Sequence, residues 1–249
     1  VEGLDPEDVW STVAAEGVNF LLIVGDAFGR PLLDELDRHD HDLSSLLMLV
    51  SGGAALSAGV KQAFLTKQPS MGVMDSIGAS ETGQQATQII GAGNEATTGT
   101  FTPGRGMCIV SEDLTRVLPP EDPELGWLAQ AGRVPRGYLG DRAKTEKTFP
   151  VIEGVRYSVP GDRARIADGL LELHGRDSVT INSGGEKIFA EEVEAALASH
   201  PAVYDAVVAG RPSERWGSEV VAIVQLRDGM DVPPEDLLAA CEKHIARYK

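Results

Sequence analysis

Hydroxyl and carboxylate side chains stand between glycines in one short segment, Asp75 to Gly83. Ser80 and Glu81 follow closely after Gly78 in this segment. Glycine allows backbone N–H groups to approach a phosphate without obstruction by side chains, and carboxylate oxygens are preferred ligands of Mg²⁺. We therefore expect the segment to hold a phosphate oxygen and a Mg²⁺ ion, although a capped helix that begins at Ser80 would explain the same pattern.

A second Gly-rich turn, Ser51-Gly52-Gly53-Ala54, follows an apolar run. Its backbone is open enough to lie against a nucleotide. A tight turn between a strand and a helix is the alternative explanation.

The remaining reactive side chains have structural explanations. The five histidines are scattered without paired ligand spacing and suit surface or capping positions. The acidic run Glu191-Glu192-Val193-Glu194 suits the first turn of a helix. Neither Ser80 nor Ser183 lies in a Gly-x-Ser-x-Gly elbow, so the sequence does not support a serine hydrolase.

The Gly-rich segments fall within an alternation of strands and helices. Short apolar runs predict strands, and helical spacing of apolar residues predicts the helices between them. Such alternation is typical of a parallel α/β sheet. The expected strands are 20–24, 46–50 and 73–75, and the expected helices are 5–16, one that starts at Pro31, and 56–65.

The pattern changes twice farther along the chain. Beyond Thr97, short β-prone pieces between Pro and Gly turns predict a β-rich, barrel-like subdomain to about residue 175. A small α+β unit should follow, and we expect the larger domain to comprise residues 1–176 and the smaller one 177–249. In the smaller domain we expect helices 191–199 and 234–247 and strands 204–209 and 219–226.

Composition excludes several classes of protein. The 249 residues carry 22 Lys and Arg against 38 Asp and Glu, a net charge of −16 that disfavours nucleic acid as a partner. No apolar run approaches the length of a membrane span. Cys108 and Cys241 are the only cysteines and lack metal-ligand spacing, so neither a disulfide framework nor a zinc site is indicated and a reducing cytoplasm fits.

Five short motifs occur in the order in which adenylate-forming enzymes carry them. The chain therefore resembles the C-terminal half of an acyl-CoA synthetase of that superfamily, and the resemblance spans essentially the whole chain. Three segments look most like the corresponding sequences of actinobacterial fatty-acyl or steroid-side-chain CoA ligases: Gly25–Phe28, Val159-Pro160 and Ile181–Lys187. The five motifs are Ser51–Ser57, Ile77–Glu81, Gly126-Trp127-Leu128 with Gly137-Tyr138, Tyr157–Asp162, and Gly175-Arg176 with Ser183–Ile188 and Glu191–Glu194.

The resemblance implies that the larger domain binds ATP. Glu81 would be the Mg²⁺ ligand, and Ser80 and Glu81 are the candidate catalytic residues. Ile77 stands where the family usually has Tyr or Phe to stack on adenine, so stacking must be weaker or come from elsewhere. Trp127 replaces the usual Glu of its motif. The residues expected to contact the nucleotide in this domain are Gly52, Gly53, Ala54, Asp75, Ile77, Gly78, Ser80 and Asp162.

Asp162 resembles the family's Gly-Asp motif, in which the carboxylate accepts hydrogen bonds from both ribose hydroxyls. An ionised Asp on a fixed turn suits that bidentate task, and a simple Gly-Asp β-turn is the weaker alternative. The resemblance further makes Arg176 a contact to ribose or phosphate and Ser178 the hinge between the domains. Gly184 and Gly185 would form part of the CoA tunnel.

The resemblance implies an enzyme that joins a carboxylic acid to AMP and transfers the acyl group to CoA, with ATP, Mg²⁺ and CoA required. The family's phosphate loop is expected before Val1 and its catalytic Lys beyond Lys249, so residues 1–249 alone should not turn over. The rest of the same polypeptide is then a partner, and an oligomer remains open. The alternatives are an amino-acid adenylation domain that loads a carrier protein, and a non-catalytic nucleotide-binding fragment.

Overall fold

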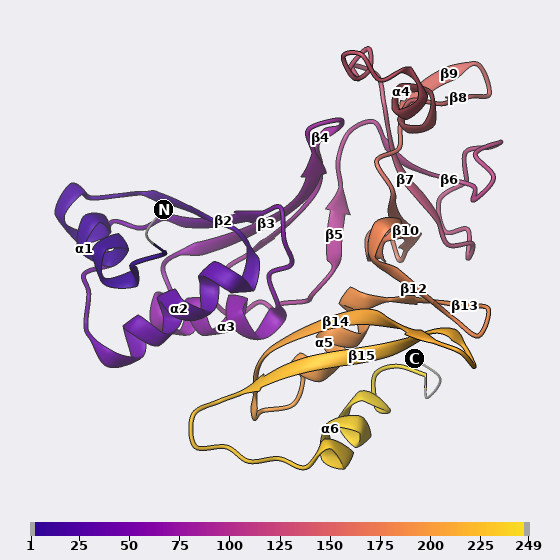
Figure 1. Cartoon of the computed structure of the whole chain (residues 1–249). Coiled ribbons are helices and arrows are strands. Elements are labelled where there is room, and N and C mark those ends of the chain that lie inside the picture. Colours follow the sequence, from indigo (N-terminus) through magenta and orange to yellow (C-terminus); the bar gives the residue numbers. More distant parts are fainter. Residues whose placement is uncertain (1–2, 247–249) are drawn as a thin grey trace. The chain divides into compact units, whose positions relative to one another are not determined.

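The computed structural model describes residues 3–246, and Figure 1 shows the order of its elements. Contacts between residues divide the chain into a larger unit, Val1–Pro160 with Arg165–Glu172, and a smaller one, Gly161–Ala164 with Leu173–Lys249. Within the described residues, no helix is long and apolar enough to cross a membrane.

The larger unit begins with the predicted alternation of helices and strands. Strands β1, β2 and β3 pair in parallel, which confirms the α/β prediction. Strand β4 (Gly83–Ile90), which the sequence analysis did not predict, runs antiparallel to β3, so the sheet is mixed beyond the three predicted strands. The elements before β4 are α1 (Pro6–Glu16), β1 (Phe20–Ile23), α2 (Gly25–Arg38), β2 (Met48–Gly52), α3 (Ala58–Lys67) and β3 (Gly72–Ala79).

Helix α2 begins at Gly25, six residues before the predicted start at Pro31. Pro31 therefore lies inside the helix, where a proline normally destabilises it by removing a hydrogen bond. Tertiary packing outweighs this effect, because Leu32, Leu33 and Leu36 on the same helix are all buried. The backbone turns into the helix at Gly25, whose φ of 59° suits glycine.

Both Gly-rich segments contain more strand than the sequence indicates. Ser51 and Gly52 are the last residues of β2, and β3 continues to Ala79. A helix starting at Ser80 is excluded because β4 begins three residues later, at Gly83. The intervening residues form the turn of a β-hairpin, which is why the chain reverses here without a crossover helix.

The first hydrophobic core lies between the three helices and one face of the sheet, with α2 and α3 along that face in Figure 1. Trp10 is fully buried, and its indole N–H donates to the Leu32 carbonyl oxygen at 2.9 Å. Its ring meets Phe64 edge-on with centroids 6.4 Å apart. These contacts join α1, α2 and α3, so the helices support the strands from one side.

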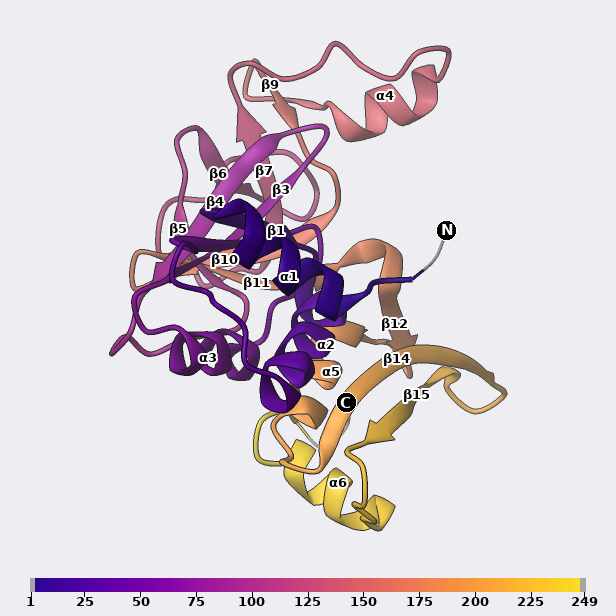
Figure 2. The same ribbon diagram turned by 90° about the vertical axis from the view of Figure 1, so that its left-hand side faces the viewer.

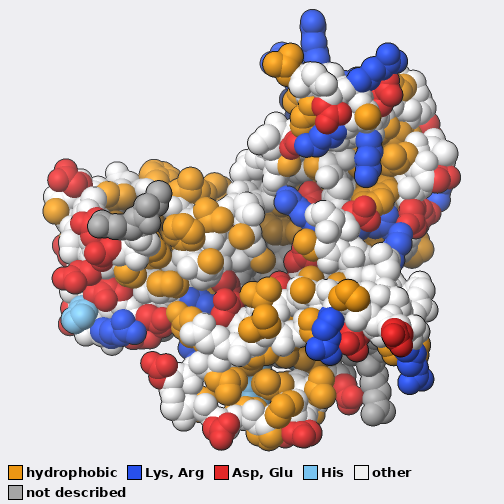
Figure 3. All heavy atoms as spheres, viewed as in Figure 1, with side chains coloured by type: hydrophobic (Ala, Val, Ile, Leu, Met, Phe, Trp, Pro, Cys, Tyr) orange, Lys and Arg blue, Asp and Glu red, His pale blue; other side chains and the backbone are white. Residues whose placement is uncertain are grey.

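Several large apolar side chains of the same unit are exposed. Phe20 and Leu22 on β1 are 66% and 71% exposed, and Ile89 on β4 is 62% exposed. Figure 3 shows hydrophobic side chains gathered over this part of the larger unit. The helices therefore cover one face of the sheet only.

The region after residue 97 consists mainly of strands, as predicted. It adds one short helix, α4 (Arg142–Thr148). The large sheet has the order β1-β2-β3-β4-β5-β11-β10-β7-β9-β8, and β6 pairs with β7. The added strands are β5 (Thr100–Pro103), β6 (Met107–Val110), β7 (Gly126–Ala131), β8 (Val151–Ile152), β9 (Val155–Ser158), β10 (Asp162–Ala167) and β11 (Leu170–Arg176).

The described part of the smaller unit contains two antiparallel hairpins and two helices, and Figure 2 shows β14 beside β15 with α6 near them. Helix α5 packs against β14 and α6, around a core that includes Ile188, Leu197 and Val208. These elements confirm the predicted α+β pattern. The elements are the 3-10 turn Asp177–Val179, β12 (Thr180–Ser183), β13 (Glu186–Phe189), α5 (Ala190–Ala198), β14 (Val203–Ser213), β15 (Gly217–Leu226) and α6 (Pro234–Cys241).

Helix α6 is shorter than the predicted helix 234–247. It ends at Cys241, and the N–H groups of Lys243 and His244 donate to the carbonyls of Ala240 and Cys241, three residues earlier. The chain therefore tightens from α-helix into 3-10-type turns. The predicted end at residue 247 lies outside the described residues.

Candidate nucleotide-binding site

An open pocket lies where strands β2 and β3 end in the larger unit. The structure thus brings together the two Gly-rich segments that the sequence singles out. Gly53 has a φ of 87°, so its backbone conformation suits glycine. The lining residues are Gly52, Gly53, Ser76, Ile77, Gly78, Ala79, Ser80, Gly83 and Gln84.

Gly78 is required by the close approach of two strands. A Cβ atom on Gly78 would lie 2.3 Å from the carbonyl oxygen of Gly83. The β3–β4 register shifts between Ile77 and Gly78, as in a β-bulge. Bulges redirect side chains and are frequent beside active sites. Here the irregularity precedes the turn that carries Ser80.

The two other predicted adenine contacts differ in their surroundings. Ile77 is only 8% exposed and lines the pocket. It therefore contributes apolar surface at the place where the resemblance leads one to expect an aromatic ring. Ala54 is exposed and does not line the pocket, so its nucleotide contact stays a prediction.

Glu81 is partly buried and tied to a distant residue of the same unit. The hydroxyl of Tyr138 donates to Glu81 Oε1 at 2.5 Å. Burial is the main cause that raises the pKa of Tyr138, and the hydrogen bond to the Glu81 carboxylate raises it further. The hydroxyl therefore remains a hydrogen-bond donor at neutral pH. The Lys144 ammonium group lies over the Tyr138 ring, 4.2 Å from its centroid, in a cation–π contact. Tyr138, which belongs to one of the sequence motifs, thus contacts a candidate site residue.

The carboxylate of Glu81 is a chemically suitable ligand for a Mg²⁺ ion. Mg²⁺ usually binds through one or two carboxylates, together with water and substrate phosphates. Among residues 3–246 no group of three or more His, Cys, Asp or Glu could hold a metal ion. Glu81 would therefore have to share such an ion with phosphate oxygens and water.

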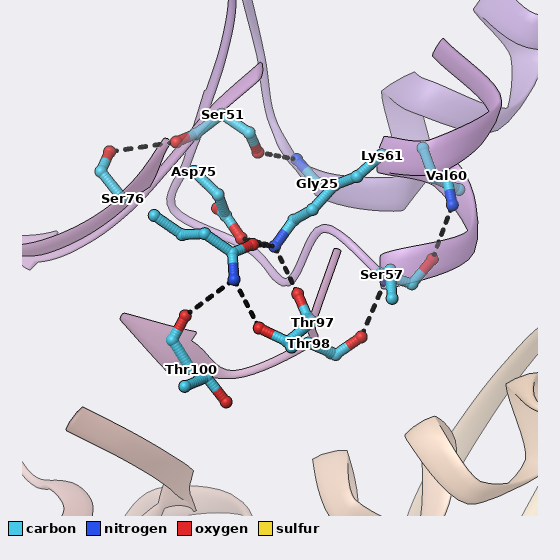
Figure 4. A network of polar contacts seen from close by, with 12 residues as sticks. Gly25, Ser51, Ser57, Val60, Lys61, Asp75, Ser76, Thr97, Thr98 and Thr100 are labelled. Atoms are coloured by element: carbon cyan, nitrogen blue, oxygen red, sulfur yellow. Dashed lines mark hydrogen bonds and ion pairs between the residues drawn. The ribbon is translucent and has the colours of Figure 1, made fainter. Parts of the chain in front are cut away.

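Asp75 has surroundings unlike those of the other candidates. It is 3% exposed and is absent from the lining residues of the pocket. Its Oδ2 lies 2.7 Å from Nζ of Lys61, on helix α3 (Figure 4). Burial raises the pKa of Asp75, and the neighbouring Lys61 opposes that shift. The predicted nucleotide contact of Asp75 stays a prediction, because the carboxylate is already engaged by Lys61 inside the core.

A second carboxylate, Asp162, is buried in the smaller unit with one oxygen unpartnered. Asp162 is 2% exposed, and its Oδ1 accepts a hydrogen bond from Arg176 Nε at 2.7 Å. Its Oδ2 has no hydrogen-bond partner among the described residues. A buried polar atom without a partner is costly and calls for an explanation. Two hydroxyl donors of a ligand would supply one, with Arg176 holding the carboxylate in place.

The other predicted residues of the smaller unit lie near one hollow and one hairpin. Ser178 is exposed and lines a hollow together with Thr180, Gly210 and Ser218. Its hinge role is not tested by this arrangement.

Gly184 and Gly185 form the two-residue turn between β12 and β13, with φ values of 59° and 92°. Two positive φ angles in such a turn favour glycine strongly. A Cβ atom on Gly184 would lie 2.9 Å from the Trp216 ring. The CoA contact of this turn stays a prediction.

Comparison with known proteins identifies the family. The family model for AMP-binding enzymes matches residues 1–139, and the model for the AMP-binding enzyme C-terminal domain matches residues 192–249. The chain is 55% identical over 250 residues to the medium-chain acyl-CoA ligase Mig of Mycobacterium avium, a match that covers 100% of this chain and 45% of that protein. It is 45% identical over 254 residues to a medium/long-chain-fatty-acid and 3-oxocholest-4-en-26-oate CoA ligase of Mycobacterium marinum, covering 98% of this chain and 45% of the relative.

The fold is shared with solved structures. ATP-bound MatB from Rhodopseudomonas palustris superposes with a TM-score of 0.80 at 22% identity, covering 99% of this chain and 48% of that one. The chain spans a little under half the length of the relatives it matches. Because a family model covers more than half of its residues and its fold is that of adenylate-forming enzymes, the chain belongs to the AMP-binding enzyme family.

Proposed function

We propose that the chain is part of an AMP-forming acyl-CoA ligase that activates a fatty or steroid-side-chain carboxylic acid. In the first step, a carboxylate oxygen of the acid attacks the α-phosphorus of ATP, an acyl-AMP anhydride forms and pyrophosphate leaves. In the second step, the thiolate sulfur of CoA attacks the acyl carbonyl carbon, a thioester forms and AMP leaves. Adenylation removes the charge that protects a carboxylate from nucleophiles and supplies a good leaving group.

The observation that carries this proposal is the unpartnered, buried oxygen of Asp162. It stands in the Gly-Asp motif of an AMP-binding family member, and Arg176 fixes the other oxygen of the same carboxylate. The ribose hydroxyls of ATP and of acyl-AMP are donors that this carboxylate can accept. The names of the similar proteins support the choice of fatty and steroid-side-chain acids as substrates.

The proposed roles in the larger unit follow from the pocket at the ends of β2 and β3. The backbone at Gly52 and Gly53 and the apolar side chain of Ile77 would lie against adenine. Ser80 would contact phosphate, and Glu81 would hold Mg²⁺, which would neutralise phosphate charge. The Tyr138 hydroxyl orients the Glu81 carboxylate through its hydrogen bond.

The remaining assignments concern the smaller unit and the rest of the protein. Arg176 would contact ribose or phosphate, Ser178 would be the hinge of a domain boundary between residues 176 and 177, and Gly184-Gly185 would border the CoA path. The cytoplasm is the proposed location. The phosphate loop and the catalytic Lys would come from other parts of the full-length protein, so residues 1–249 alone are expected to be inactive.

The test is an acid-dependent exchange assay on the full-length protein. Isotope exchange between ATP and pyrophosphate is measured with a panel of medium-chain, long-chain and steroid-side-chain acids, and acyl-CoA products are identified by mass spectrometry. Exchange followed by acyl-CoA formation supports the proposal. Exchange with amino acids alone, without any acyl-CoA, would favour the carrier-protein alternative, and the absence of exchange with every acid would overturn the enzymatic assignment.

A further inference from the structure

A fully buried lysine lies behind the pocket, where neither the motifs nor the proposed reaction assign it a role. The side chain of Lys61 on α3 is 0% exposed. Its ammonium group reaches Asp75 Oδ2 at 2.7 Å, Gln88 Oε1 at 2.7 Å and the Thr97 carbonyl oxygen at 2.8 Å (Figure 4). An ammonium group has three donors. All three therefore have a partner within this network.

The three partners come from separate parts of the chain. Asp75 lies on β3 and Gln88 on β4, and the two residues are directly opposite each other in the antiparallel register. Thr97 belongs to the segment between β4 and β5, and its hydroxyl oxygen accepts a hydrogen bond from Gln88 Nε2. One ammonium group thus joins a helix, two strands and a connecting segment.

The network lies next to the irregular part of the β3–β4 pair. Asp75 opposes Gln88, Ser76 opposes Thr87 and Ile77 opposes Ala86, after which the register shifts at Gly78. A one-residue slip in a strand pair moves each side chain to the opposite face. Pinning the pair Asp75–Gln88 therefore determines which residues after it face the pocket.

The same stretch of β3 is held from its other face. Successive side chains of a strand point to opposite faces, so Asp75 meets α3 whereas Ser76 lines the pocket. The Ser76 hydroxyl donates to the Ser51 carbonyl oxygen on β2 at 3.0 Å. The rotation of β3 just before the pocket is thus fixed by a contact on each face.

Stability alone is a weak explanation for this arrangement. A buried ion pair loses much of its attraction to the cost of desolvation, and well-packed apolar residues are often as stabilising. What an apolar replacement cannot provide is the directional set of three hydrogen bonds that defines one register. In some proteins, buried polar or charged networks specify one arrangement rather than add stability.

We infer that Lys61 is a positioning residue of the nucleotide site: its ammonium group fixes the register of β3 against β4 and thereby the orientation of residues 76–80. This inference rests on the proposed nucleotide binding. Lys61 does not touch the nucleotide in this arrangement. It acts through Asp75 and Gln88 on the strand that carries the pocket-lining residues.

The test compares Lys61→Met with Lys67→Met in the full-length protein. Lys67 is a matched control because it lies on the same helix but pairs with Asp37 and donates to the Leu36 carbonyl oxygen, both on α2 rather than on β3 or β4. Binding of ATP is measured by calorimetry, and hydrogen exchange of the backbone amides of residues 76–83 is measured by mass spectrometry. Both are recorded well below the melting temperature of each variant.

We expect Lys61→Met to raise the Kd for ATP at least tenfold and to speed exchange in residues 76–83, whereas Lys67→Met changes each by less than twofold. If Lys61→Met does not fold, Lys61→Met/Asp75→Leu is used, because it leaves no buried unpaired charge. The double variant should also bind ATP at least tenfold more weakly. A folded variant of either kind with wild-type ATP affinity and wild-type exchange would overturn the inference. Failure of the wild-type protein to bind ATP would instead overturn the proposed function on which the inference rests.

Discussion

Replacement of Asp162 by Asn tests the ribose assignment most directly. The change keeps the size of the side chain and one oxygen for Arg176, but it removes the negative charge and replaces an acceptor by a donor. Hydrogen bonds to charged groups contribute about 1.5–3 kcal/mol each. At 1.4 kcal/mol for each factor of ten, the loss of one such bond should raise the Kd for ATP about 10- to 100-fold.

The folded structure should tolerate this substitution. The Arg176 side chain is 52% exposed, so solvent screens its ion pair with Asp162, and the Asn side chain keeps an oxygen that can still accept from Arg176. The buried Oδ2 makes no hydrogen bond with described residues that folding would lose on its removal. We therefore expect a small change in the free energy of unfolding beside a large change in nucleotide affinity.

Calorimetric titration of the full-length protein with ATP and with 2′,3′-dideoxy-ATP completes the test. Wild-type protein should bind the dideoxy nucleotide about 10- to 100-fold more weakly than ATP. The Asp162→Asn variant should bind the two nucleotides with nearly equal affinity, since its side chain no longer accepts from the hydroxyls. Equal losses for both nucleotides on mutation would show that Asp162 does not contact the ribose, and the reasoning from its unpartnered oxygen would be wrong.

Three further substitutions or treatments address other parts of the chain. Glu81→Gln should slow ATP–pyrophosphate exchange at least tenfold while a non-hydrolysable acyl-AMP analogue still binds, because a neutral amide is a poor Mg²⁺ ligand; normal exchange at matched Mg²⁺ would contradict the assignment. Ser178→Pro should slow thioester formation more than acyl-AMP formation, because proline fixes φ at a proposed hinge, and single-turnover rates equal to those of Ser178→Ala would place the hinge elsewhere. Burial raises the pKa of Cys108 to about 11. Its alkylation by iodoacetamide at pH 8 should therefore be roughly two orders of magnitude slower than that of an exposed peptide thiol. Rapid labelling of the folded protein would refute the burial argument.

Local sequence patterns predicted the helices and strands well where apolar residues recur with a regular period. They predicted them poorly where tertiary contacts determine the boundaries of an element. The strands β1 to β3 and helix α5 follow directly from apolar runs and helical spacing. The start of α2 could not be read from the sequence, because Pro31 favours a helix start by local preference. Buried contacts of Leu32, Leu33 and Leu36 instead extend the helix through the proline.

The site could be predicted only as far as its motifs are continuous in sequence. Gly52 and Gly78 lie in recognisable Gly-rich segments, and the structure brings both to one pocket. The hydrogen bond between Glu81 and Tyr138 joins residues 57 positions apart, so no local pattern could reveal it. Lys61 left a weak signal, since a lysine between the buried residues Val60 and Phe64 interrupts the apolar face of α3.

Asp75 and Asp162 show why residue type and strand position do not suffice to identify a ligand contact. Both are aspartates in strands, both are almost fully buried, and each accepts from one cation, Lys61 or Arg176. They differ in what surrounds the cation. The Lys61 ammonium group has all three donors occupied inside the core, whereas Arg176 is half exposed and leaves Asp162 Oδ2 unpartnered. A carboxylate whose network closes within the protein is satisfied by the fold, whereas a buried acceptor without a partner calls for a donor from outside that network; for this reason we propose positioning for the pair Lys61–Asp75 and ribose binding for Asp162.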